Sequence, residues 1–492
     1  MNDLRFYPSR YTVETCTLNG AEITYRVFKG LAYCASPASK IQVLNLFAPE
    51  CYFDGGAING YTLHTAPIFM PNTVGGYMQG PAMEPGIDRF NGKPNTAFEA
   101  LRHGYVVAAA GIRGRNTGEV SHDFFVGSDS GAEQEADGAL VGRAPALIVD
   151  MKAAIRYLRH NRDLIPGDTE RIITNGTSAG GALSALTGAT GNSADYAPYL
   201  AAIGAAEERD DIFAASCYCP IHNLDHADAA YEWLFGQERS FHRIKFVKTP
   251  QGIRMEPESG LLTEKQLEVS KVLKAQFPAY VNSLHLTDPA GNALTLEADG
   301  NGSFRDYVKG FVMASAQREL DTGWSKAQGR LMVLGADVEK QGYLTIEDGK
   351  VTDLDWAGYV GAITRMKTAP AFDDLGLKSA ENEEFGDERV YARHFTKTAM
   401  DYSDVPAELA DPKLVKLLNP TCYIGAADTC KHWRIRHGAY DRDTAIAIPV
   451  ILATLLMNQG CDVDFALPWG LPHSGDYDLE ELFAWIDGLC RA

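Results

Sequence analysis

The chain has 492 residues, of which 45% are hydrophobic and 22% are charged. This composition is typical of a globular protein with a sizeable core, and it excludes a disordered, collagen-like or coiled-coil chain. There are 45 Lys plus Arg against 64 Asp plus Glu, which gives a net charge of −19. Because so acidic a surface repels phosphates and anionic lipids, we expect neither nucleic acid nor a membrane surface as a partner.

The absence of a visible targeting signal and the pattern of cysteines favour a reduced, cytoplasmic protein. No apolar run approaches the roughly 20 residues of a membrane span, and residues 1–5 (MNDLR) do not begin a secretory signal. A secreted protein whose signal had been removed would have the same sequence. Nine cysteines, an odd number spread over a long chain, indicate thiols rather than a disulfide framework. The oligomeric state is left open.

Strands and helices alternate in the first part of the chain. Continuous apolar runs predict buried strands at residues 41–47, 105–110, 171–175 and 212–219. Residues 144–160 carry apolar side chains at helical spacing and predict an amphipathic helix. Such alternation is typical of an α/β fold, a mostly parallel sheet with helices on both faces. The polar, Gly-rich residues 118–142 predict a surface loop.

The alternation stops after Pro220. Residues 221–417 are more charged and have few strand signals, and helices are predicted at 262–284 and 306–320. Strand and helix patterns then return at residues 433–437, 445–459, 463–467 and 479–490. We therefore predict a core formed by residues 1–220 and 418–492, interrupted by a large, mainly helical lid of residues 221–417.

A G-x-S-x-G motif around Ser178 lies between the strand at 171–175 and the helix that follows. In this context the motif predicts the nucleophile turn of an α/β-hydrolase, which has no room for side chains at Gly176 and Gly180 and exposes the serine hydroxyl above the sheet. The helix N-terminus would supply N–H groups to an oxyanion. The alternative is a serine that merely caps the helix; the strand and helix around the motif favour the nucleophile.

A serine nucleophile needs a base that is oriented by a carboxylate. In α/β-hydrolases these residues follow in the order Ser, Asp, His. Asp441 follows the predicted strand at 433–437, and His473 follows the strand at 463–467. Both positions lie beyond the carboxyl ends of strands, where sites of α/β proteins are found. The sequence therefore predicts the triad Ser178, Asp441 and His473.

Other histidines compete for the role of base. His432 and His437 lie in a predicted strand and fit packing or hydrogen-bonding roles better. His222 and His226 have the i, i+4 spacing of a helical metal pair, but no HExxH glutamate stands between them, so we do not expect a metal there.

Asp443 has two possible roles. It can face the site from the same loop as Asp441, or it can cap a helix that starts at Thr444, which is the usual role of an aspartate at such a position.

The motifs resemble those of the bacterial tannases, tannin acyl hydrolases of the α/β-hydrolase superfamily. The resemblance extends over nearly the whole chain, including the predicted lid. It is carried by MPNTVGGYM (70–78), GYVVAAAGIRGR (104–115), IITNGTSAGGALSAL (172–186), CPIHNLDHADAAYEW (219–233), GSFRD (302–306), RMKTAPAFD (365–373), KHWRIRHGAYDRDT (431–444) and DFALPWGLPHSGDYDL (464–479).

The resemblance implies roles for further residues. It implies the same triad and an oxyanion hole formed by the backbone N–H groups of Ala179 and Gly76, with Gly75 as the alternative to Gly76. The galloyl hydroxyls would be contacted by the side chains of Lys367, Glu381 and Asp443. Ile221 would line the slot for the aromatic ring.

These groups suit a ring with three adjacent phenols. Carboxylates accept phenolic protons, and an ammonium donates to a phenol or pairs with a partly ionised one. Without the resemblance, Lys367 and Glu381 would be read as a salt bridge on the lid surface, worth at most about 1 kcal/mol. Spacing alone does not single them out.

The predicted function is therefore hydrolysis of galloyl esters to gallic acid and an alcohol through a galloyl-enzyme, without a metal or organic cofactor. The partners are small galloyl esters and gallate. Two alternatives remain: a feruloyl or general carboxylesterase with the same triad, and a non-catalytic binding module on the hydrolase fold. The sequence does not identify the preferred alcohol.

Overall fold

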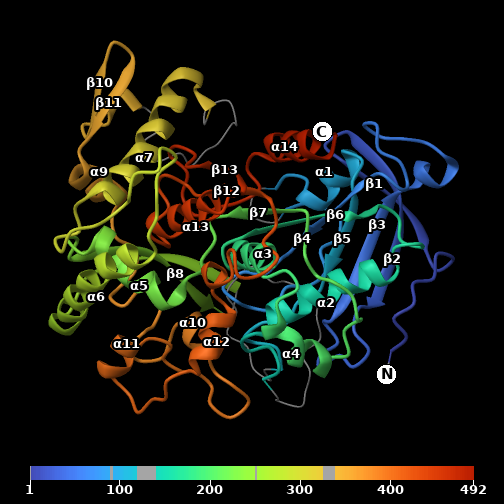
Figure 1. Cartoon of the computed structure of the whole chain (residues 1–492), viewed down its shortest axis with the longest axis horizontal. Helices are drawn as coiled ribbons and strands as arrows, with labels where there is room; N and C mark the ends of the chain where they lie inside the picture. The colour runs from blue at the N-terminus through green and yellow to red at the C-terminus, as the bar shows by residue number, and fades with distance from the viewer. Residues whose placement is uncertain (1, 89–91, 119–139, 250–251, 325–337, 492) are drawn as a thin grey trace.

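A computed structural model of the chain describes residues 2–88, 92–118, 140–249, 252–324 and 338–491. A nine-stranded sheet crosses the molecule in the order β1-β2-β3-β5-β4-β6-β7-β12-β13 (Figure 1). Four strands pair antiparallel: β1 (Thr12–Leu18), β2 (Ala21–Ala32), β3 (Val43–Pro49) and, against β3, β5 (Val106–Ala110). From β5 onward the pairing is parallel, through β4 (Pro67–Pro71), β6 (Asp168–Thr177), β7 (Ala214–Tyr218), β12 (His432–Arg436) and β13 (Asp462–Ala466).

The strands β4, β5 and β7 are nearly continuous apolar runs, as expected for strands with both faces covered. Every residue of β5 and β7 is buried. The edge of the sheet at β1 is more exposed, and its two outer strands are joined by a tight turn. β1 and β2 form a hairpin whose turn residues, Asn19 and Gly20, both have positive φ, as a two-residue turn between twisted strands requires. The sequence analysis did not predict this hairpin.

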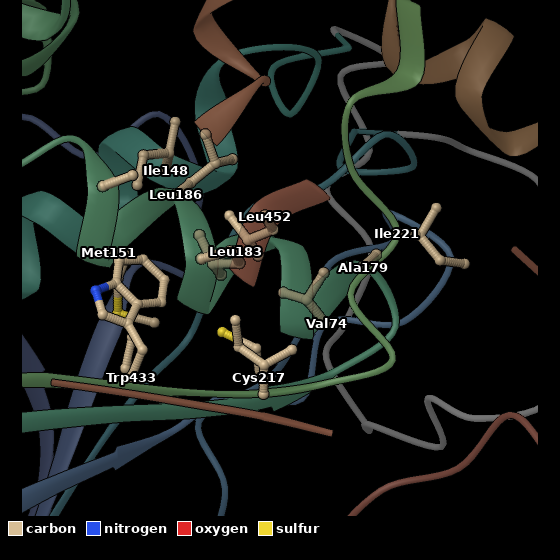
Figure 2. Close-up of a cluster of buried hydrophobic side chains, with 14 of the residues drawn as sticks. Val74, Ile148, Met151, Ala179, Leu183, Leu186, Cys217, Ile221, Trp433 and Leu452 are labelled. Carbon is tan, nitrogen blue, oxygen red and sulfur yellow. The ribbon is translucent and has the colours of Figure 1, made fainter. Parts of the chain in front are cut away.

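Helices pack on both faces of the sheet. On one face α1 (Thr96–Arg102) packs with α14 (Leu479–Arg491). The other face carries α2 (Ala146–His160), α3 (Ala179–Ala189), α4 (Ala197–Ala202) and α13 (Ala447–Asn458). Figure 2 shows side chains of α2, α3 and α13 in one buried hydrophobic cluster together with Trp433 of β12. The predicted α/β-hydrolase core is confirmed.

The segment between β7 and β12 contributes no strand to the nine-stranded sheet within the described residues. Its helices are α5 (Leu224–Phe235), α6 (Glu264–Ser283), α7 (Ser303–Thr322), α9 (Trp356–Ile363), α10 (Ala380–Glu384), α11 (Lys397–Asp401) and α12 (Pro412–Leu417). In Figure 1 these helices lie to one side of the sheet. Short 3₁₀ turns complete the described elements: η1 (Glu50–Asp54), η2 (Ala194–Tyr196), η3 (Val338–Lys340) and η4 (Pro420–Cys422).

Two antiparallel hairpins interrupt this mainly helical segment: β8 (Ser240–Thr249) with β9 (Gly252–Leu261), and β10 (Leu344–Glu347) with β11 (Lys350–Leu354). Neither hairpin was predicted from the sequence. The turn of the second is Asp348-Gly349, with φ of 49° and 74°. An Asp-Gly pair between alternating residues is a strong hairpin signal, and it was available in the sequence.

Among the described residues, no helix has both the length and the apolar character needed to cross a membrane. Most of the loop predicted at 118–142 lies outside the described residues.

Candidate active site

The turn between β6 and α3 has the geometry of a strained nucleophile turn. Ser178 has φ of 63° and ψ of −124°, and its side chain makes no capping hydrogen bond to the helix. A Cβ at Gly176 would lie 2.3 Å from both Asn72 Nδ2 and the Gly180 carbonyl oxygen, and a Cβ at Gly180 would lie 2.4 Å from Asn72 Oδ1. The predicted lack of room at both glycines is confirmed, and the alternative that Ser178 caps the helix is wrong.

The predicted base and its carboxylate meet on two adjacent loops. Asp441 follows β12 and His473 follows β13, and these strands pair in parallel. His473 Nδ1 donates to Asp441 Oδ2 at 2.7 Å. Burial works against a charged imidazole, but the carboxylates of Asp441 and Asp443 and the nearby Cys219 raise the pKa of His473 well above its ordinary value. Although burial opposes it, His473 keeps the pKa of Asp441 below its usual range.

The third member of the triad is less tightly joined. No hydrogen bond within the described residues connects Ser178 Oγ with His473 Nε2. His473 Nε2 lies 3.8 Å from Cys219 Sγ, and that thiol donates to the Ser474 carbonyl oxygen at 3.4 Å. Catalytic hydrogen bonds are often long before substrate binds. The chain therefore brings Asp441 and His473 together directly and places Cys219 beside the nitrogen that would receive the serine proton.

The loop predicted to form the oxyanion hole is a tight turn. Met78 N donates to the Gly75 carbonyl oxygen at 3.0 Å, and the central residues Gly76 and Tyr77 both have positive φ, 52° and 58°. Positive φ at both central residues is the pattern of a type I′ turn. A Cβ added at Gly75 or Gly76 would meet no atom within 4 Å, so this face of the turn is open. Ala179 is the first residue of α3, where amides lack an acceptor inside the helix.

Two residues that sequence reasoning missed hold this turn in place. Asn72 Nδ2 donates to the carbonyl oxygens of Asn175 and Gly180, each at 3.0 Å, and so joins the loop to the serine turn. Arg115 Nε donates to the Gly76 carbonyl oxygen at 2.8 Å. Both lie in segments that carry the family resemblance, but no spacing rule gave either of them a role.

Lys367 and Asp443 form an ion pair next to the Asp441–His473 pair. Lys367 Nζ lies 2.6 Å from Asp443 Oδ1, and Asp443 N donates to Asp441 Oδ1 at 2.8 Å. Burial disfavours the charge of Asp443, but the ammonium of Lys367 and the imidazole of His473 lower the pKa of Asp443 to about 2. The helix that follows begins at Ala447 and has no side-chain cap. The alternative role of Asp443 as a helix cap is therefore wrong.

Glu381 lies in the first turn of α10 and is buried. Burial raises the pKa of Glu381, and the Lys367 ammonium acts in the opposite direction. Lys367 therefore interacts with Asp443 by direct contact and with Glu381 electrostatically. An ammonium and two acids thus come from three separate segments of the chain.

Ile221 lies against the predicted nucleophile. Its backbone N–H donates to the Ser178 carbonyl oxygen at 3.2 Å, and its carbonyl oxygen accepts the Tyr77 hydroxyl at 2.7 Å. Figure 2 shows its side chain in the same view as Ala179 and Val74. Ile221 is therefore tied to both the serine turn and the glycine turn.

The remaining histidines have other surroundings. His226 stacks on Tyr280 with 3.5 Å between ring centroids, and His222 is buried without a polar partner in the described structure. Neither belongs to a group of three metal-ligating side chains among the described residues. His432 Nδ1 lies 3.0 Å from Asp462 Oδ2, and His437 Nδ1 lies 3.5 Å from Asp441 Oδ2.

Comparisons with known proteins agree with this geometry. A family model described as BD-FAE matches residues 139–215, and no curated protein matches the chain. A crystal structure of tannase from Lactobacillus plantarum is 48% identical, covers 99% of this chain and 100% of its own, and has a TM-score of 0.89. A tannin acyl hydrolase in complex with ethyl gallate is 48% identical over 99% of both chains, with a TM-score of 0.88. A tannase from Fusobacterium nucleatum is 45% identical over 99% of both chains, with a TM-score of 0.88.

The mostly parallel sheet and the serine turn at its centre define a carboxylic ester hydrolase of the α/β-hydrolase fold. Identity at this level extends over the complete length of the related structures. The chain belongs to the tannase family.

Proposed function

We propose that this chain hydrolyses galloyl esters, both tannins and simple gallates, to gallic acid and the alcohol. The observation that carries the proposal is the Lys367–Asp443 pair, with Glu381 close by, directly beside the Asp441–His473 pair. An ester whose carbonyl lay near Ser178 could direct its ring toward these charges. Two structures of related tannin acyl hydrolase, one in complex with ethyl gallate and one with 3,4-dihydroxybenzoate, support an aromatic acid with ring hydroxyls as the acyl group.

In the proposed mechanism Ser178 Oγ attacks the ester carbonyl while His473 Nε2 takes its proton. Asp441 holds the imidazole through Nδ1 and stabilises the imidazolium. The amides of Ala179 and Gly76 donate to the oxyanion. His473 then protonates the leaving alcohol, and a water molecule activated by the same imidazole releases gallate from Ser178.

The acyl specificity follows from charge and burial. Phenolic hydroxyls of the ring would donate to Asp443 and Glu381 and accept from Lys367. A ring without hydroxyls would leave these groups without partners after water is displaced. A site of this kind can discriminate by roughly 10⁴–10⁵ against an analogue that lacks the hydroxyls.

Residues 221–417 would act as a lid over the core in this proposal. They contribute Ile221, Lys367 and Glu381, whereas the triad and Asp443 come from the two core segments. The acyl pocket would thus be complete only where the lid meets the core.

The acyl specificity is tested by comparing methyl gallate, methyl ferulate and methyl benzoate as substrates of the purified protein. We expect kcat/KM to be highest for methyl gallate and at least about 10³-fold lower for methyl benzoate, given the discrimination that such sites reach. Faster turnover of the benzoate would contradict the three-hydroxyl pocket. A preference for the ferulate would favour a feruloyl esterase.

The nucleophile is tested with Ser178→Ala. We expect the rate with methyl gallate to fall by at least about 10⁴-fold, because loss of a triad nucleophile removes covalent catalysis. Ser240→Ala, on β8, serves as the matched control. Unchanged turnover by the folded Ser178→Ala protein would show that the mechanism is wrong, whereas a wild type that hydrolyses none of the three esters would favour the binding-module alternative.

A further inference from the structure

One thiol beside the triad has no role in the proposed mechanism. Cys219 follows β7 directly, has a φ of 34°, and its side chain is fully buried. Its Sγ lies 3.8 Å from His473 Nε2. This nitrogen is the atom that must receive the proton of Ser178, so whatever binds between the thiol and the imidazole blocks catalysis.

The separation of these two atoms matches that of two ligands of one soft cation. In tetrahedral zinc sites the Zn–S distance is about 2.3 Å and the Zn–N distance about 2.0–2.1 Å. At the tetrahedral angle of about 109°, these bonds place S and N about 3.6 Å apart. The observed 3.8 Å needs only a slightly wider angle.

The opposite side of the imidazole is also arranged as in a metal site. Histidines that bind metals through one nitrogen usually donate the other N–H to a carboxylate, which fixes the ring and raises its basicity. His473 Nδ1 donates to Asp441 Oδ2 at 2.7 Å in this way. Ligand atoms of Cys219, Asp441 and His473 all lie within 4.8 Å of one another.

We propose that Cys219 and His473 form a binding site for a soft divalent cation such as Zn²⁺ or Cd²⁺, and that occupation of the site inhibits the esterase. On binding, the Cys219 S–H bond breaks and its proton leaves to solvent, while a bond from sulfur and a bond from Nε2 form to the cation. Water completes the coordination. No electron is transferred. The inhibition, but not the binding, rests on the proposed role of His473 as the base.

The surroundings of the pair are compatible with reversible binding. The His473 side chain is 22% exposed, so solvent reaches the imidazole. Burial raises the pKa of the Cys219 thiol, and His473 acts against this rise. Because a cation binds the thiolate form of cysteine, binding at this site is linked to release of the thiol proton.

The experiment uses the full chain and Cd²⁺ as the probe, with two independent readouts. Binding is followed by equilibrium dialysis and by the ultraviolet charge-transfer band of a cadmium thiolate, and inhibition by the rate of methyl gallate hydrolysis. The test variants are Cys219→Ala and Asp441→Asn. The control removes the two exposed thiols with Cys51→Ala and Cys422→Ala. Each protein is compared with its own metal-free rate.

We expect the wild type and the control to bind one Cd²⁺ at the site, to lose activity, and to regain it when EDTA is added. Cys219→Ala should lose the charge-transfer band and need at least about 10-fold more Cd²⁺ for half-inhibition. Asp441→Asn should bind Cd²⁺ about 10–100-fold more weakly by dialysis, as for other carboxylates that orient a ligating histidine.

Two outcomes would overturn the proposal in distinguishable ways. If Cys219→Ala binds Cd²⁺ as tightly as the wild type and is inhibited equally, the site is elsewhere, while the proposed esterase mechanism stands. If the charge-transfer band depends on Cys219 but the Cd²⁺-bound wild type turns over methyl gallate at its metal-free rate, the proposed inhibition does not occur and His473 is not the base.

Discussion

Two carboxylates act on the imidazole of His473 from different positions. Asp441 contacts Nδ1 directly, whereas Asp443, which is paired with Lys367, acts on the imidazole electrostatically. Both favour the imidazolium and raise the pKa of His473. A general base must be neutral to accept a proton. The activity of the free enzyme should therefore rise with pH through an apparent pKa above the ordinary value of histidine.

The contribution of Asp443 can be isolated with Asp443→Asn. Removing the negative charge destabilises the imidazolium and lowers the pKa of His473, so His473 becomes neutral at lower pH. We expect the acidic limb of the pH profile of kcat/KM to move to lower pH. The substrate should be an ester without ring hydroxyls, because Asp443 is also proposed to bind the galloyl ring.

Asp306→Asn is a suitable control for this prediction, since Asp306 is exposed on α7. Its profile should coincide with that of the wild type. If the acidic limb of the Asp443→Asn profile stays in place or moves to higher pH, Asp443 does not act on the base.

The sequence predicted individual site residues to very different degrees. Ser178, Asp441 and His473 follow from a general rule, because α/β sites lie at the carboxyl ends of strands. Lys367 and Glu381 came only from the family resemblance, since Lys367 lies in an irregular segment and Glu381 lies in a helix of five residues, too short to show periodicity. Nothing in the sequence indicated Cys219 as a neighbour of His473, because their contact depends on how two separate loops pack.

At the scale of elements, one guanidinium connects the glycine turn to α10. Arg115 Nε donates to the Gly76 carbonyl oxygen at 2.8 Å, and Arg115 N donates to the Tyr77 carbonyl oxygen at 2.8 Å. The same guanidinium pairs with Glu383 of α10, the helix that carries Glu381. Arg115 is thus a positioning residue for both the proposed oxyanion hole and the acyl pocket.

The two functions of Arg115 should separate in two variants. Arg115→Gln loses both contacts, so we expect kcat to fall by up to about 100-fold on every ester, because displacing catalytic groups by about 1 Å costs this much. Glu383→Gln loses only the contact with α10. It should raise KM for methyl gallate and leave kcat for an ester without ring hydroxyls unchanged.

Steady-state kinetics of both variants on both substrates check this prediction. Arg115→Lys is the conservative comparison, because an ammonium keeps the charge without the planar fork that reaches two partners. Identical changes of Arg115→Gln and Glu383→Gln on both substrates would contradict separate roles.

Whole elements were predicted well where periodicity is strong and poorly where pairing is local. The buried strands β5, β6, β7, β12 and β13 and helices such as α2 and α6 agree with the sequence analysis within a few residues, whereas β4 was not predicted. The hairpins of the insertion were missed because their strands are not the continuous apolar runs from which the buried strands were predicted. Their signal is in the turn, as Asp348-Gly349 shows.

At the scale of the whole molecule, the proposed acyl pocket lies where the insertion meets the core. Tyr231 of α5 joins the two parts through one hydroxyl. This hydroxyl accepts the backbone N–H groups of Met366 and Lys367, at 3.2 and 3.0 Å, and donates to the Arg442 carbonyl oxygen at 2.9 Å. It therefore sets the position of Lys367 relative to the loop that carries Asp441 and Asp443.

Tyr231→Phe removes this connection and keeps the buried ring. Two N–H groups and one carbonyl oxygen would lose a partner, and a buried unsatisfied group costs about 1–3 kcal/mol. We expect the free energy of unfolding, measured with urea, to fall by about this amount. The displaced Lys367 should also raise KM for methyl gallate, while kinetics with an ester lacking ring hydroxyls stay close to the wild type.

Tyr359→Phe is the matched control for this prediction. The Tyr359 hydroxyl also crosses from the insertion to the core, where it donates to the Ala439 carbonyl oxygen. Within the described residues, no hydrogen bond joins this hydroxyl to the Lys367 segment. Its loss should lower stability and leave KM for methyl gallate unchanged. If both variants raise KM equally, the effect comes from a general loosening between insertion and core, and Tyr231 has no specific role in placing Lys367.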